Sequence, residues 1–172
     1  MSLLQRLFRP GPDPREALRP LWHRVVELSR TPALYEEDGV ADTVAGRFDM
    51  IAAILALVLL RIERDPTLMR EGVLLTELFV EDMDGQLRES GVGDVVVGKH
   101  VGKLMAVLGG RLGALREALA APGDGELQAA LERNVTMLEG HDTAALATRL
   151  RTFANALAGL DSKKLMAGEI AL

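Results

Sequence analysis

The chain has 172 residues, no cysteine and a net charge of −5. Its length fits one domain with a substantial core, and the lack of cysteine excludes a disulfide scaffold, zinc thiolates and cysteine nucleophiles. The three histidines are far apart and form no H-x-x-x-H pair, so the sequence predicts no metal site. Leu and Ala dominate and aromatic residues make up only 3%, which predicts an all-α fold.

The charge is distributed unevenly along the chain. Residues 1–30 carry a net charge of +3, residues 31–98 carry −9, and residues 99–172 carry +1. An acidic middle argues against nucleic acid as a partner. It suits a basic partner segment, although a solvated acidic face is the commoner origin of such a bias.

Residues 1–14 are predicted to be an amphipathic arm and linker ahead of a helical domain over residues 15–172. The apolar stripe of this arm consists of Leu3, Leu4, Leu7 and Phe8. The stripe is too short for a signal peptide, and with Arg6 and Arg9 beside it, it predicts weak contact of residues 3–9 with an anionic membrane. An arm that docks on its own domain, or that is frayed, explains the stripe equally well.

The spacing of apolar residues in the domain predicts a single compact bundle of about six helices. The first helix begins at Pro14 or Pro20, with the regular part starting near Arg19 because Pro suits a first turn. The others are predicted at 43–64, 67–90, 95–120, 125–139 and 143–159, with a short tail helix at 161–167. Their predicted N-caps include Asp42 or Thr43, Asp94, Asp124 and Asp142.

The helix over residues 43–64 is predicted to lie at the centre of the bundle. Its MIAAILALVLL segment is apolar on every side, and Asp49 and Arg61 bound it. A membrane span needs about 20 such residues, so a shorter helix of this kind belongs in a protein core.

Five glycines interrupt the helix predicted over residues 95–120. They are Gly98, Gly102, Gly109, Gly110 and Gly113. Each glycine inside a helix costs about 1 kcal/mol relative to Ala. Their G-x-x-x-G spacing therefore predicts that another backbone approaches this helix closely.

Residues 93–100, GDVVVGKH, match seven of the eight positions of a phosphate-binding P-loop. His100 stands where the motif needs a hydroxyl for Mg²⁺, and a helical pattern precedes the glycines where a strand is required. A nucleotide-binding enzyme is therefore the least favoured interpretation. The sequence predicts a protein-binding module that is not an enzyme and has no cofactor.

Two stretches resemble the ubiquinol–cytochrome c chaperone family. DTVAGRFDMIAAILALVLLRI at residues 42–62 is similar to the D-T-x-x-G-R-F-D segment of that family. VEDMDGQLRESGVGDVVVGKHVGKL at residues 80–104 is similar to its second block. The two blocks keep the family's order, and the likeness is clearest over residues 15–120.

The resemblance implies an assembly chaperone for respiratory complex III that is cytoplasmic and peripheral on the inner membrane. Its implied partners are a membrane-protein client, cytochrome b, and a small helical co-chaperone. A helical scaffold with a different membrane-protein client remains the alternative. The partner-binding residues implied by the motifs are Arg47, Asp49, Asp82, Asp84, Gly91, Gly93, Lys99 and Lys103. Phe48 is expected in the core and Gly91 at a helix C-terminus.

Overall fold

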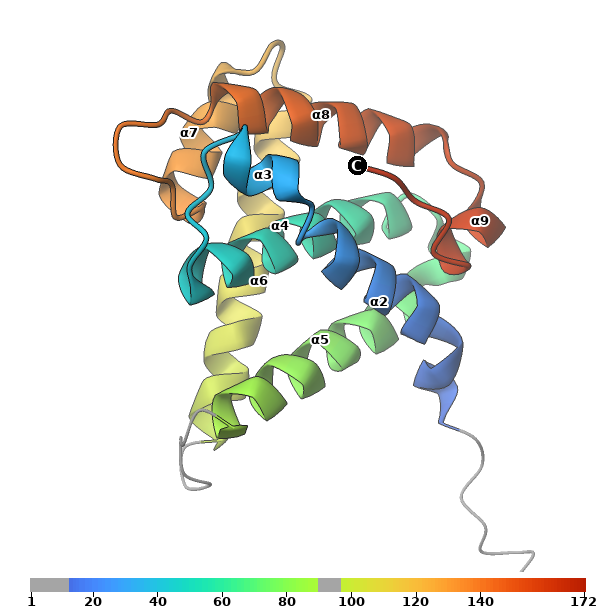
Figure 1. The fold of residues 1–172 in the computed structure, drawn as a ribbon. Coiled ribbons are helices and arrows are strands. Elements are labelled where there is room, and N and C mark those ends of the chain that lie inside the picture. Colours follow the sequence, from blue (N-terminus) through green and yellow to red (C-terminus); the bar gives the residue numbers. More distant parts are fainter. Residues whose placement is uncertain (1–12, 90–96) are drawn as a thin grey trace, which may run out of the picture.

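The computed structural model describes the main chain of residues 13–89 and 97–172, and the side chains of residues 13–86 and 101–172. Within these ranges the chain forms a helical bundle around α4 (Val44–Ile62), as predicted (Figure 1). Residues 50–59 of α4 are buried without interruption. Because this helix is apolar on every side, it requires neighbours all around it, which places it at the centre.

Four long helices contact α4 and cover it from different sides. They are α2 (Arg19–Leu28), α5 (Met69–Glu89), α6 (Val97–Ala120) and α8 (Ala144–Gly159). The shorter elements are η1 (Pro14–Leu18), α3 (Pro32–Glu36), η2 (Pro66–Leu68), α7 (Gly125–Asn134) and α9 (Ser162–Met166). In Figure 1, α8 lies above α4, α5 lies below it, and α6 stands upright beside both. The predicted all-α bundle is confirmed.

The first regular helix begins at Arg19, as the position of Pro20 predicts. Its buried stripe includes Trp22, whose ring meets the ring of Phe79 on α5 edge-on, with centroids 6.1 Å apart. The offset or edge-on arrangement is the one that aromatic quadrupoles favour. This contact fixes α2 across α5.

The predicted end of the helix over residues 125–139 is wrong. α7 ends at Asn134, and the next residues are extended. Met137 forms an antiparallel bridge with Val40, and main-chain hydrogen bonds of 2.9 and 2.8 Å flank that bridge. Pairing with a segment almost a hundred residues earlier satisfies these backbone groups, so the local helical spacing does not decide their conformation.

Two of the predicted caps act differently from the prediction. Asp124 occupies the N-cap position of α7, but its carboxylate pairs with Arg151 instead of capping. Thr143 occupies the N-cap position of α8, while the Asp142 carboxylate accepts a hydrogen bond from the Ala144 N–H at 3.0 Å. Asp142 thus still satisfies a donor in the first turn.

The close backbone contact predicted for the glycines of α6 is not observed. A Cβ atom built at any of four of them would meet no atom of a neighbouring element within 4 Å. These four are Gly102, Gly109, Gly110 and Gly113. Gly98 lies outside the residues whose side-chain surroundings the structure describes. The core side of α6 is instead a stripe of larger residues, Leu104, Leu108, Arg111, Leu115 and Ala118, and the glycines lie off it.

The C-terminal helix α9 is tied to the joint between α4 and α5 through Asp65. The Asp65 carboxylate accepts hydrogen bonds from the Thr67 hydroxyl at 2.6 Å and from the Ser162 hydroxyl at 2.7 Å. These two bonds, with that of Thr67 first, lower the pKa of Asp65 below its ordinary value of 3.8. Every helix in the described part of the chain is too short or too polar to span a membrane.

Candidate functional site

The first motif block, residues 42–49, forms the entrance to α4. The Thr43 hydroxyl caps the helix by accepting from the Gly46 N–H at 3.1 Å. Of the two predicted caps, Thr43 is the one observed; Asp42 instead pairs with Arg47 at 2.6 Å, and both of these side chains are more than half exposed. A Cβ at position 46 would come within 2.0 Å of the Ala41 carbonyl oxygen, so the motif needs glycine there for close approach.

Asp49 is the centre of a buried polar junction between α4, α6 and the segment after α7. Its carboxylate pairs with Arg111 and accepts from the Thr136 N–H at 2.9 Å and the Thr136 hydroxyl at 2.7 Å. Arg111 also donates to the Asn134 carbonyl oxygen at 2.7 Å. The two charged side chains are only 11% and 10% exposed. A buried charge must be paired and hydrogen-bonded. The Asp49 carboxylate meets both conditions, whereas Nε and Nη1 of Arg111 are buried without a hydrogen-bond partner among the described residues.

Phe48 completes this junction. Its ring lies beneath the Arg111 guanidinium, with 5.4 Å from the guanidinium carbon to the ring centroid, a distance typical of a cation–π contact. The ring of Phe48 also lies against that of Phe79, with 6.3 Å between the centroids. The first block therefore has a structural task in the fold, and Asp49 is occupied by partners within the chain. Arg47 alone of its two predicted contact residues is exposed.

The second block contributes residues to α5 and α6. Asp82 and Asp84 are half-buried on α5, and Asp82 lines a shallow hollow against α2. Lys103 is exposed on α6. Gly91, Gly93 and the predicted cap Asp94 lie outside the described residues, as does the side chain of Lys99. Helix α5 precedes residues 90–96, as predicted, whereas a P-loop requires a strand at that place.

An open apolar groove of about 720 Å³ lies between α5 and α6, and sequence analysis did not predict it. In Figure 1, these two helices approach each other at the ends that flank residues 90–96 and separate away from them. The apolar lining includes Ile62 of α4, Met69, Val73 and Val80 of α5, and Val101 and Met105 of α6. Met69, Val73 and Met105 are 55%, 59% and 45% exposed. Large apolar side chains gathered in this way mark an interaction site.

Charged residues border the groove. Glu63, Glu77 and Glu81 line it together with Arg15 of η1. Of the three carboxylates, Glu63 is paired with Arg116 and Glu81 with Arg15. An apolar floor with an acidic border suits a segment that is apolar and basic.

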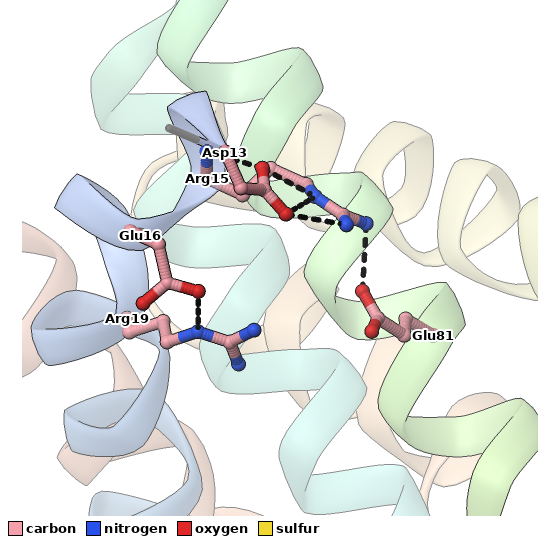
Figure 2. Close-up of polar contacts among 5 residues, drawn as sticks. All are labelled: Asp13, Arg15, Glu16, Arg19 and Glu81. Atoms are coloured by element: carbon pink, nitrogen blue, oxygen red, sulfur yellow. Dashed lines mark hydrogen bonds and ion pairs between the residues drawn. The ribbon is translucent and has the colours of Figure 1, made fainter. Parts of the chain in front are cut away.

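Arg15 connects the beginning of the described chain to the groove (Figure 2). Its guanidinium donates to Glu81 on α5 at 2.6 Å and to Asp13 at 2.7 Å. The Arg15 side chain, and then its N–H group, lower the pKa of Asp13 to about 2. Asp13 is therefore charged at neutral pH, and the ion pairs of Arg15 with Asp13 and Glu81 hold η1 beside the groove.

A sequence signal for the groove does exist. Met69, Val73 and Val80 lie four and seven residues apart, so they share one face of a helix. The core stripe of the same helix, with Leu75, Phe79 and other buried residues, accounts for the helical pattern by itself and conceals this second stripe. A helix that is apolar on two faces needs a second partner.

An open apolar groove in an all-α domain is a candidate site for binding a segment of another protein. The family model described as Ubiquinol-cytochrome C chaperone matches residues 36–172. The chain belongs to this family, and the resemblance found in its two motif blocks is confirmed. Among curated proteins, none matches the chain.

A solved structure supports the same assignment. The crystal structure of the Cbp3 homolog from Brucella abortus is similar, with a TM-score of 0.80 and 29% sequence identity. The match covers 99% of this chain and 96% of that one. The family and the fold of the chain therefore agree.

Proposed function

We propose that the chain is an assembly chaperone that binds a newly made subunit of ubiquinol–cytochrome c reductase, cytochrome b, through the groove between α5 and α6. The observation that carries the proposal is this open apolar groove in a member of a chaperone family. A membrane subunit exposes apolar segments before it is assembled. The groove would cover one such segment, and its acidic border would match basic residues that flank the segment.

The same proposal includes where and how the chain works. It acts as a binding protein and not as an enzyme, in the cytoplasm and peripherally at the inner membrane, where its client is inserted. A small helical co-chaperone is part of this proposal. Asp82, Asp84, Lys99 and Lys103 are proposed to extend the client surface from the groove towards the α5/α6 joint, since Val101 of the groove lies between the two lysines in sequence.

A matched pair of valine substitutions tests the groove. Val73→Glu places a carboxylate on the apolar floor, whereas Val44→Glu changes an equally apolar and 89% exposed side chain at the start of α4. Both positions are exposed, so the free energy of unfolding of each variant should stay within about 0.5 kcal/mol of that of the parent chain, as checked by thermal melts. Membranes from cells that carry Val73→Glu should show no cytochrome b absorbance, whereas membranes from cells that carry Val44→Glu should show it at the parent level.

Normal cytochrome b levels with a folded Val73→Glu chain would contradict the groove assignment. A helical scaffold with another membrane-protein client is the second candidate, because the groove would accept any apolar and basic segment. Capture from membranes of respiring cells separates the two. The proposal requires that cytochrome b is captured with the parent chain and lost with Val73→Glu.

A further inference from the structure

We propose that the chain's own residues 1–12 dock in the groove between α5 and α6 and cover it in the absence of a client. The docking itself does not depend on the proposed function. Its consequence, that arm and client compete for one groove, rests on the proposed function. The arm lies outside the described residues, so the evidence comes from the groove, from the sequence of the arm and from the point where the two meet.

The sequence of the arm matches the chemistry of the groove. The arm offers an apolar stripe, with Leu7 and Phe8 at its end, and the basic residues Arg6 and Arg9 beside it. The groove offers an apolar floor bordered by the carboxylates of Glu63, Glu77 and Glu81, of which Glu63 is paired with Arg116 and Glu81 with Arg15. Opposite charges at the borders orient such a segment, while contact between the apolar surfaces supplies most of the favourable free energy.

The described chain begins at the groove. Arg15 lines the groove and is bound to Glu81, so Asp13, two residues earlier, lies at its border (Figure 2). Six residues separate Leu7 from Asp13, a reach of about 20 Å when extended. Val73 lies eight residues before Glu81 on α5, about 12 Å along the helix axis. The stripe of the arm therefore reaches the exposed floor of the groove without any rearrangement of the bundle.

The covalent connection favours this occupant over a free segment of similar composition. A segment tethered over so few residues has an effective concentration of about a millimolar at the groove, so modest contacts suffice for docking. A client would displace the arm only if it made better contacts. The arm would thus protect Met69, Val73 and Met105 from non-specific association.

Disulfide formation in the purified full-length chain tests the docking, since the chain has no cysteine of its own. The double variant Leu7→Cys/Val73→Cys should form an intramolecular disulfide in mild oxidant. The matched control keeps both cysteines and adds Leu4→Ser and Phe8→Ser, which breaks the stripe without changing the reach of the linker. We expect the control to cross-link at least about tenfold more slowly, the loss that a broken docking contact predicts.

Equal rates in the two chains would overturn the proposal. A disulfide-linked dimer as the main product would also overturn it, because the occupant would then be the arm of a second copy. The methionine methyl signals in NMR spectra provide an independent measurement. Removal of residues 1–12 should shift the methyl signals of Met69 and Met105 and leave that of the buried Met50 in place; no shift at the two groove methionines would refute docking. Both experiments use no client, so their failure is distinguishable from that of the proposed function.

Discussion

Replacement of Asp49 by Ala should destabilise the chain strongly, because it removes one member of a buried ion pair. Arg111 would keep its charge at 8% exposure, and the N–H and hydroxyl of Thr136 would lose their acceptor. Breaking a buried pair from one side costs about 3–5 kcal/mol. Ala is the best helix former, so α4 itself suffers no loss of propensity. Since a domain is stable by only about 5–15 kcal/mol, this change removes a large part of the total.

Urea unfolding followed by the fluorescence of the single, buried Trp22 measures the effect. Asp42→Ala is the control in the same motif, because the Asp42–Arg47 pair is exposed and a surface ion pair contributes little to stability. The double variant Asp49→Ala/Arg111→Met should cost less than the sum of its single changes by about 1–3 kcal/mol. A loss below about 1 kcal/mol for Asp49→Ala would refute the reasoning, as would strict additivity of the two changes.

Three further outcomes are expected. Gly46→Ala should destabilise the chain by about 1–3 kcal/mol, because the added Cβ would lie 2.0 Å from the Ala41 carbonyl oxygen. Gly110→Ala lies on open helix surface, so it should stabilise the chain by up to about 1 kcal/mol in the same unfolding assay. Asp65 has a lowered pKa, mainly through the Thr67 hydroxyl, so its contribution to stability is complete above the unfolded value near 3.8 and is lost as the pH falls through the folded value. In an NMR titration its midpoint should lie below 3.8, and a midpoint at or above 3.8 would contradict this.

The centre of the fold could be predicted from sequence because its signal is local. The uninterrupted apolar segment gives a helix over residues 43–64, and α4 spans Val44–Ile62. The end of α7 could not be predicted in this way. Its chain turns away at Val135 to pair with the segment around Val40, and this long-range pairing leaves no periodic trace in either segment.

The candidate site was only partly predictable, for a different reason. The motif resemblance identified Asp49 as important, but its burial depends on Arg111, which is 62 positions away. Arg111 stands in a stripe of α6 where Leu108 and Leu115 flank it at helical spacing, and this position is the one trace of its burial in the sequence. The groove was missed because the core stripe of α5 accounts for the helical pattern by itself and conceals the second stripe of Met69, Val73 and Val80.

The junction at Asp49 and the groove are connected through α6. Arg111 is held by Asp49 and by the Asn134 carbonyl oxygen, and this anchorage fixes the rotation of α6 about its own axis. The next residue, Leu112, lines the groove, and Met105 lies on the same face seven positions earlier. A rotation of α6 that released Arg111 would turn this face out of the groove. Asp49 does not line the groove, but through Arg111 it sets how α6 presents the proposed client surface.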